Sequence, residues 1–249
     1  MARLFDDANS QDLTRTDTAG FTGLPVTMAC WFMSDDIAAA QALMGLYNTG
    51  STSGLYALFA QGNVAGDPVR AWHIQDNGTS SFAATTTGYS ANTWHHACAI
   101  FASTASRTAY IDGGSSATET TSRSAPTPDI FRIASRKHSG AADAFVSGRI
   151  AEAAVWFAAL TADEVAELAK GVSPKRIRPE SLVAYWDIVG KNSPEIDQVG
   201  GYDLTLSASA PTAADHPRIF MPRRRQILVP SAAGGGIVDH HLLLMGAGT

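Results

Sequence analysis

The chain of 249 residues fits one large domain, and its 45% hydrophobic and 16% charged residues indicate a folded protein with a weakly charged surface. The formal net charge of -5 argues against a general nucleic-acid binder, which would carry a basic excess or stripe. The two cysteines, Cys30 and Cys98, are too few for a disulfide-built scaffold, and we expect reduced, buried thiols.

The N-terminal sequence MARLFDDANSQDL lacks the apolar segment of about 7–15 residues that a secretory signal needs, and no stretch of about 18 apolar residues occurs. We therefore expect synthesis in a cytoplasm and no membrane insertion. We assign residues 1–20 to an N-terminal arm with the first strand, 21–210 to the main domain and 211–249 to an extended C-terminal tail.

Short apolar runs separated by Gly, Ser, Thr and Asn clusters fill the chain from about Val26 to Ile133. Their spacing of about 8–12 residues predicts an antiparallel sandwich or barrel. Several runs are apolar at both parities, which predicts central strands covered on both faces. The runs are VTMACWFMS, ALMGLYNT, GLYALFAQ, RAWHIQD, SSFAATTT, WHHACAIF, RTAYID and IFRIAS.

The run WHHACAIF places two histidines beside a cysteine. Side chains of a strand alternate between its faces, so His95 and His96 point to opposite sides and cannot easily chelate one ion. His96 and Cys98 share a face, but structural zinc takes four ligands and no matching pair occurs elsewhere. We predict a packed strand that forms a β-hairpin with RTAYI, followed by a turn at Asp112-Gly113.

One helix is predicted after these runs. Thr161 and Glu164 form a capping box, Val165 and Leu168 give an apolar stripe, and Gly171 ends the helix. A basic connector between two prolines follows and contains Lys175, Arg176 and Arg178. Strands are predicted again at SLVAYWDI and GYDLTLS. They would return the chain to the sandwich edge where the N-terminal strand begins.

Two of these motifs resemble a known family. The pair WHHACAIF and RTAYIDG is similar to the hairpin of laminin-G-like, concanavalin A-like lectin/glucanase jelly rolls, and SGRIAEAAVWFAALTADEVAEL resembles the strand and short helix that follow it there. The resemblance runs from about Phe21 to Leu206. It implies an all-β, two-sheet antiparallel jelly-roll sandwich with one short helix and extended terminal segments. The connector, the LVAYW strand and the tail PSAAGGG also resemble the versions of this domain in tailed-bacteriophage structural proteins.

The glucanases of this superfamily carry paired carboxylates on one strand, because retaining hydrolysis needs two carboxyl groups about 5–5.5 Å apart. Glu152 stands alone in RIAEAAVW, and Asp163, Glu164 and Glu167 lie on the predicted helix. No nucleophile elbow, Walker loop or HExxH helix occurs. We therefore predict no catalytic residues and no enzyme activity, while a carboxylate pair assembled from distant loops stays open.

Sugar binding by jelly rolls uses aromatic rings with polar neighbours, and packing within the core is the alternative for each ring. The predicted carbohydrate-binding residues are Tyr47, Asn48, Trp72, Asp76 and Asn77, and Tyr56, Tyr89 and Tyr110 are further candidate rings. No cofactor is predicted. Calcium stays open because Asp76-Asn77-Gly78 and the pair of Asp112 and Asp143 offer oxygens, although calcium takes about 6–8 of them.

The C-terminal tail lacks the length for a core of its own, so its apolar cluster indicates burial against a partner. The assembly residues are Arg223, Arg224, Arg225, Ile237, Leu242, Leu243 and Leu244; the alternative for the arginines is a solvated charge run. We expect a non-enzymatic virion structural protein of a tailed bacteriophage, for capsid decoration or in a tail or fibre. Its partners would be major capsid or tail proteins, further copies of itself and host surface glycans, with no direct nucleic-acid contact. The alternatives are a free lectin and, third, a glycoside hydrolase.

Overall fold

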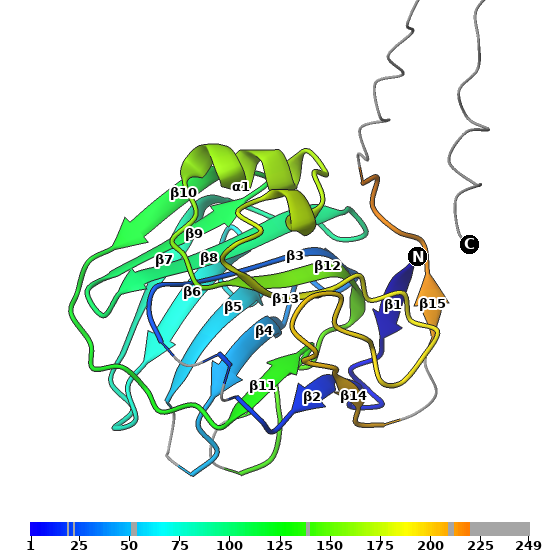
Figure 1. Ribbon diagram of the computed structural model, residues 1–249, viewed down its shortest axis with the longest axis horizontal. Coiled ribbons are helices and arrows are strands. Elements are labelled where there is room, and N and C mark those ends of the chain that lie inside the picture. Colours follow the sequence, from blue (N-terminus) through cyan, green and yellow to red (C-terminus); the bar gives the residue numbers. More distant parts are fainter. Residues whose placement is uncertain (19, 22, 51–53, 138–139, 209–211, 220–249) are drawn as a thin grey trace, which may run out of the picture.

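Two antiparallel β-sheets form the computed structural model, which describes residues 1–18, 20–21, 23–50, 54–137, 140–208 and 212–219 (Figure 1). The eight-stranded sheet contains, in spatial order, β10 (Gly114–Glu119), β9 (Ser106–Ile111), β8 (His95–Ser103), β3 (Val26–Ser34), β12 (Gly148–Trp156), β1 (Ala2–Phe5) and β15 (Ala213–Ala214), with β13 (Leu182–Trp186) also paired to β12. The seven-stranded sheet contains β14 (Thr205–Leu206), β2 (Leu13–Arg15), β11 (Ile130–Ile133), β4 (Ala40–Tyr47), β5 (Leu55–Gln61), β6 (Pro68–Ile74) and β7 (Ser80–Gly88). The predicted all-β sandwich is confirmed.

The first residues of the chain take part in both sheets. β1 pairs with β12 in the eight-stranded sheet, and β2 pairs with β11 in the seven-stranded sheet. Arg3 of β1 is buried, and its guanidinium group donates to the Glu195 carboxylate at 2.7 Å. The arm at residues 1–20 is therefore bound into the sandwich by backbone pairing and by a buried ion pair.

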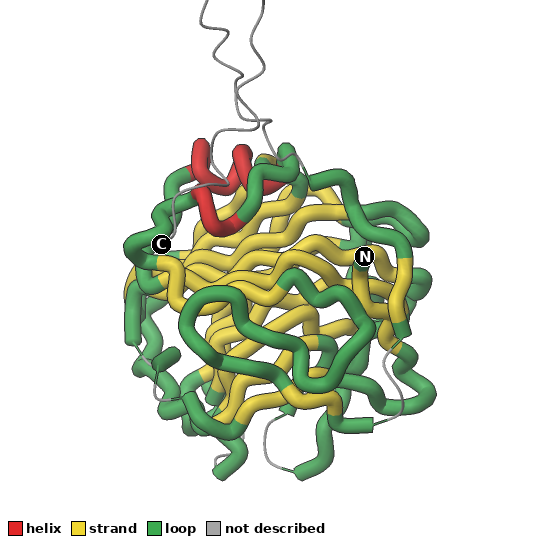
Figure 2. Tube along the Cα trace, turned by 45° about the vertical axis from the view of Figure 1, so that its right-hand side comes forward, coloured by secondary structure: helices red, strands yellow, loops and turns green. Residues whose placement is uncertain are grey.

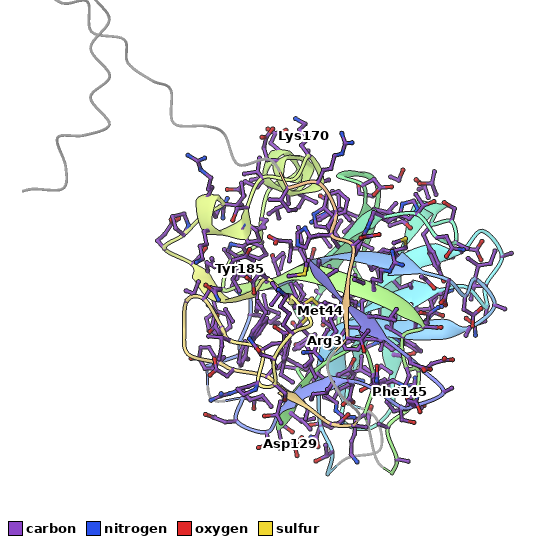
Figure 3. The ribbon with its side chains drawn as sticks, turned by 90° about the vertical axis from the view of Figure 1, so that its right-hand side faces the viewer. Arg3, Met44, Asp129, Phe145, Lys170 and Tyr185 are labelled. Carbon is purple, nitrogen blue, oxygen red and sulfur yellow. The ribbon has the colours of Figure 1, made fainter. Side chains whose placement is uncertain are left out.

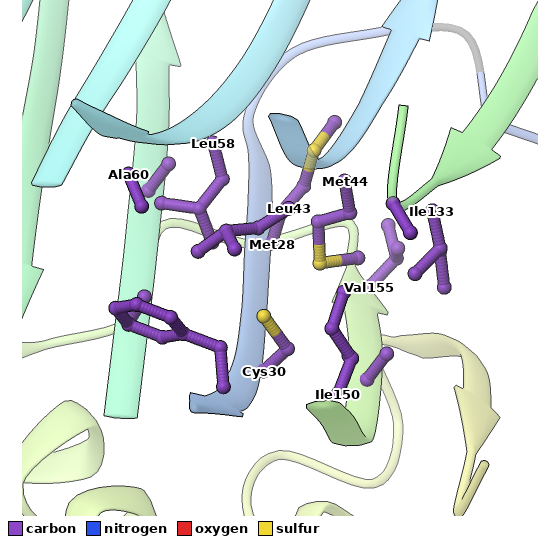
Figure 4. Packing of buried hydrophobic residues seen from close by; sticks show 14 of the residues in the cluster. Met28, Cys30, Leu43, Met44, Leu58, Ala60, Ile133, Ile150 and Val155 are labelled. Atoms are coloured by element: carbon purple, nitrogen blue, oxygen red, sulfur yellow. The ribbon is translucent and has the colours of Figure 1, made fainter. Parts of the chain in front are cut away.

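The core lies between the two sheets, where one face of each strand points inward (Figure 4). Met28, Cys30 and Val155 come from the eight-stranded sheet, and Met44 and Leu58 face them from the seven-stranded sheet. Burying such a side chain contributes roughly 1.5–3 kcal/mol, so this layer supplies most of the force that holds the sheets together.

Both cysteines are free and buried, as expected, but they lie on opposite faces of one sheet. Cys30 belongs to the core between the sheets, whereas Cys98 lies in the cluster under the helix. Burial raises the pKa of both thiols, so they remain protonated and act as small apolar side chains.

The predicted hairpin is confirmed in β8 and β9. Ser103 pairs with Ser106, so two residues form the connection. At the next turn Asp112 and Gly113 both have positive φ, 51° and 75°, and the Asp112 carboxylate accepts the His96 N–H at 2.9 Å. Two consecutive positive φ values match the twist of a right-handed β-ribbon, which explains the Asp-Gly pair at this position.

The predicted helix is α1 (Ala162–Ala169), followed by the short 3₁₀ helix η1 (Pro174–Arg176). The capping box of Thr161 and Glu164 is present, and Gly171 ends the helix at φ 89°. Val165 and Leu168 are buried in an apolar cluster on the outer face of the eight-stranded sheet, and Figure 2 shows α1 lying along one side of the strand layers. Among the residues described, no helix combines the length and the apolar character that crossing a bilayer would require.

The Thr161→Ala substitution should lower the free energy of unfolding by about 1 kcal/mol, because the Glu164 N–H at the start of the helix loses its side-chain acceptor. Chemical denaturation measures the change. Thr120→Ala is the matched control, since this exposed threonine lies outside the helix. Equal unfolding midpoints for the Thr161→Ala variant and the unmodified protein would contradict the assigned cap.

Candidate functional site

The chain crosses the outer face of the eight-stranded sheet after it leaves β15. We call residues 212–219 the strap, which lies beside β1 in Figure 1. Ala213 and Ala214 pair with Arg3 and Ala2, and the Leu4 N–H donates to the Thr212 carbonyl at 2.9 Å. The start of the strap is therefore fixed to the sheet edge by backbone hydrogen bonds.

A second attachment of the strap is the carboxylate of Glu152 in β12. One oxygen lies 3.1 Å from His216 Nε2, and the other accepts the Tyr185 hydroxyl at 2.7 Å. His216 Nδ1 lies 2.7 Å from the Pro217 carbonyl oxygen, so both ring nitrogens face oxygen atoms. Since Glu152 is 7% exposed, these partners compensate a buried charge.

Glu152 occupies a β-bulge. The register between β12 and β3 shifts between Ala151 and Ala154, and Glu152 has φ 53°. This left-handed conformation is uncommon for a residue other than glycine, and bulges re-aim side chains. The bulge therefore turns a carboxylate toward the strap at mid-strand.

His96 lies beside Glu152 and Trp31 beneath the end of the strap. It is 2% exposed, and burial lowers the pKa of its imidazole to about 4, partly opposed by the charge of Asp112. The ring is therefore neutral at neutral pH, and its edge contacts the Trp31 indole with centroids 5.5 Å apart. His96 forms part of the apolar floor here, in agreement with the predicted packed strand.

A groove of about 620 Å³ lies between the strap and the sheet, and we call it the strap groove. Residues 215–218 form one wall. The sheet side is formed by Trp31, Met33, Asn92, Trp94 and Arg149. Both indoles are partly exposed, and a volume of this size lies within the usual range of about 300–1,000 Å³ for small-molecule sites.

The strands explain why these groove residues meet. Trp31 and Met33 are two residues apart in β3 and point to the same face. Arg149 of β12 pairs with Met33, and Trp94 comes directly before β8. Three neighbouring strands thus bring two aromatic rings and one guanidinium group to the outer face of the sheet.

Of the five predicted carbohydrate-binding residues, Asn48 and Asp76 are brought together. The Asn48 amide donates to Asp76 at 3.1 Å and to Thr127 at 2.7 Å, while the Thr127 hydroxyl donates to Asp76 at 2.8 Å. Asn77 lies in the adjoining turn and accepts the Thr79 N–H at 3.0 Å. This polar cluster lies near Asp129, which Figure 3 shows at the end of the molecule opposite Lys170, the residue that follows α1.

The predicted aromatic rings lie elsewhere. Tyr47 is fully buried and Trp72 partly buried in one apolar cluster on the outer face of the seven-stranded sheet, where the Arg136 guanidinium lies 5.9 Å from the Trp72 ring. Tyr56 and Tyr89 are buried in the main core. A buried ring has no face for a sugar, so we correct the assignment of Tyr47; sugar binding by the other four residues stays a prediction.

The proposed calcium oxygens are engaged by protein groups. The Asp112 carboxylate accepts a hydrogen bond from the His95 ring at 2.7 Å, and the Asp143 carboxylate accepts one from Arg136 Nε at 2.8 Å. Within the described ranges, no group of three or more His, Cys, Asp or Glu residues has the arrangement of a metal site. Calcium binding therefore gains no support from the arrangement of these oxygens.

The predicted assembly residues in the tail, Arg223–Arg225, Ile237 and Leu242–Leu244, lie outside the described residues. The connector that precedes β13 is described. Arg178 donates to Glu164 at 2.6 Å, and the Lys175 ammonium lies 5.5 Å from the Tyr185 ring. Two of its three basic groups thus have partners within the chain.

A family model described as the concanavalin A-like lectin/glucanases superfamily matches residues 7–166, more than half of the chain. The chain belongs to this superfamily. The match spans the hairpin and most of the helix on which the resemblance was based, so that part of the prediction is confirmed. A search of the curated proteins found no match.

Solved structures share this fold at low identity. A proposed carbohydrate binding protein from Bacteroides ovatus is 16% identical with a TM-score of 0.58, over 87% of this chain and 60% of that one. A heptameric SAP-like pentraxin from Limulus polyphemus is 12% identical with a TM-score of 0.53, over 68% of this chain and 81% of that one. The NanB sialidase of Streptococcus pneumoniae is 15% identical with a TM-score of 0.52, over 66% of this chain and 27% of that one.

Trp31, Asn92, Arg149 and Asp215 line this groove, and none of them was among the predicted site residues. A partial signal existed, because alternation along VTMACWFMS places Trp31 and Met33 on one face. Phe32 between them hid this signal, because it is also apolar and points to the core. No local pattern indicates that residues 215–218 return to this face.

Lowering the pH from 6.5 to 4 should destabilise the protein partly through His96, because its folded-state pKa lies below that of the unfolded chain, which therefore binds the proton first. A difference between 6.5 and about 4 corresponds to about 3 kcal/mol. Over this pH range the free energy of unfolding of the His96→Gln variant should therefore fall by about 3 kcal/mol less than that of the unmodified protein. Urea unfolding at each pH measures both values. His73, whose pKa burial also lowers to about 4, titrates in both proteins. Identical pH dependence of the two would contradict a neutral, buried His96.

Proposed function

We propose that this protein is a non-catalytic carbohydrate-binding protein whose ligand lies in the strap groove. The observation that carries the proposal is the pair of partly exposed indoles of Trp31 and Trp94 beside Asn92 and Asp215 in an open groove. Aromatic faces pack against the C–H faces of sugar rings, while amide and carboxylate groups bind hydroxyls. Three classes of sugar-binding group therefore share one groove.

The fold supports the same proposal. The superfamily contains lectins and glucanases, and the Bacteroides ovatus neighbour is itself a proposed carbohydrate binding protein. The identities of 12% to 16% establish a common fold, so the proposed sugar contact rests on the chemistry of the strap groove.

The buried carboxylate that holds the strap, Glu152, supports the non-catalytic assignment. A glycoside hydrolase needs one carboxyl group free to donate a proton and a second to act as nucleophile or base. Both oxygens of Glu152 already contact Tyr185 and His216, which gives this residue a structural role in holding the strap. Release of reducing sugars from bacterial polysaccharides by the purified protein would overturn this assignment.

Trp94→Ala should weaken glycan binding by roughly tenfold or more, because loss of a stacking ring of about 1.4 kcal/mol changes affinity by that factor. Trp31→Ala should act in the same direction. A glycan array followed by titration calorimetry with the best ligand gives the measurement.

Trp72→Ala is the matched control, since its indole is also partly exposed but lies on the other sheet. It should leave binding unchanged. Loss of binding in Trp72→Ala with full binding in Trp94→Ala would instead place the ligand at the seven-stranded sheet, near the site that the sequence predicted.

We also propose that the protein serves as a virion structural protein of a tailed bacteriophage, in capsid decoration or in a tail or fibre, where sugar binding aids adhesion to the host surface. Support comes from the order of connector, LVAYW strand and PSAAGGG tail, and from a composition with only 16% charged residues. The partners would be major capsid or tail proteins and further copies of this chain. A free lectin is the alternative.

The full chain should form oligomers, whereas a chain ending at Pro222 should be a folded monomer, because the removed segment carries the apolar residues Ile237 and Leu242–Leu244. Light scattering at matched concentration gives both masses. The shorter chain keeps every residue of the strap groove. Two monodisperse monomers would favour the free-lectin alternative over an assembly role.

A further inference from the structure

An arginine without a partner among the described residues lies in the strap groove. Arg149 is on the outer face of β12, where its neighbours across the sheet are Met33 and Leu4. It is partly buried, and no described residue forms a hydrogen bond or an ion pair with its guanidinium group. Placing a charge between two apolar side chains has a desolvation cost that nothing described in this chain offsets.

Other arginines of the sandwich have partners within the protein. Five of them form ion pairs with carboxylates: Arg3, Arg15, Arg132, Arg136 and Arg178. Arg107 and Arg123 donate to backbone carbonyls. Arg149 therefore stands out among the partly buried guanidinium groups as one whose donors remain available.

The charge balance of the strap groove is positive. Arg218 of the strap is exposed and, like Arg149, forms no ion pair with a described residue. His216 lies 3.1 Å from the Glu152 carboxylate, and Asp215 is the one carboxylate among the described lining residues. Two guanidinium groups face one carboxylate, in a chain whose formal net charge is -5. The groove is thus locally suited to an anionic ligand.

We propose, building on the proposed sugar-binding function, that the ligand of the strap groove is a carboxylated saccharide such as a uronic acid or a sialic acid. Its carboxylate pairs with Arg149, and a sugar ring packs on Trp31 or Trp94. A planar guanidinium group binds a carboxylate through two parallel hydrogen bonds, which a point charge does not match. Asp215 and Asn92 then bind ring hydroxyls.

The test compares one glycan in two forms. The probe is an oligogalacturonate or a sialylated oligosaccharide, whichever binds better on an array that also holds sulfated and neutral glycans, and its partner is the methyl ester of the same glycan. The acidic form should bind at least tenfold more tightly in titration calorimetry. Arg149→Met, which keeps the apolar stem, should remove this preference while leaving the affinity for the ester unchanged.

Three further variants separate the causes. Arg149→Lys keeps the charge and should restore only part of the preference. Arg176→Met removes an exposed arginine of the connector, outside the strap groove, and should change nothing. Circular dichroism verifies that each variant is folded, and Arg218→Met, on the strap, tests the same charge if Arg149→Met is unfolded.

The outcomes distinguish the two proposals. Equal or tighter binding of the ester, a preference for sulfated glycans, or an unchanged preference in Arg149→Met overturns the carboxylated ligand while sugar binding through Trp94 stands. Failure of every glycan to bind overturns the proposed function, and the acidic specificity with it.

Discussion

The bulge at Glu152 is the constraint on which the outer face of the eight-stranded sheet depends. The first half of β12 pairs with β1 and the second half with β13, and the change of neighbour falls between Ile150 and Ala153. A residue in the left-handed conformation at this junction turns a carboxylate outward, where it meets Tyr185 and His216. Because an uncompensated buried carboxylate would be strongly destabilising, both the position of β13 and the path of the strap are coupled to this one side chain.

Two segments from different parts of the chain cover the sheet on either side of this junction. The helix α1 buries the half that contains Cys98 and Trp156, through Val165 and Leu168. The strap crosses the other half. A helix carries its own backbone hydrogen bonds and packs closely on the strands, whereas the extended strap is held at its start by β1 and at His216 by Glu152. Beside residues 215–218 the sheet side chains stay partly exposed, which produces the groove.

The chemistry of the groove follows from the same arrangement. Its floor contains two indoles and the Met33 side chain, so apolar contact dominates there. The polar and charged groups around this floor differ in their protein contacts. His216 contacts the Glu152 carboxylate, whereas Arg149 and Arg218 form no ion pair with the residues described. An apolar floor with available cationic donors suits a ligand that has both a ring face and an anionic group, and acidic sugars meet both conditions.

The sequence by itself determined the local elements and the fold class. Alternating runs, the Asp112-Gly113 turn and the capping box of Thr161 and Glu164 depend on near neighbours in the chain, and each is present. Only the tertiary structure decided which residues form a site. It buried Tyr47, placed Trp72 under Arg136, and brought Trp31, Trp94 and Arg149 beneath residues 215–218. Strand order and the path of the strap are set by contacts between residues far apart in the chain, such as Arg3 with Glu195 and Glu152 with His216. Hydrophobic periodicity carries no information about such pairing.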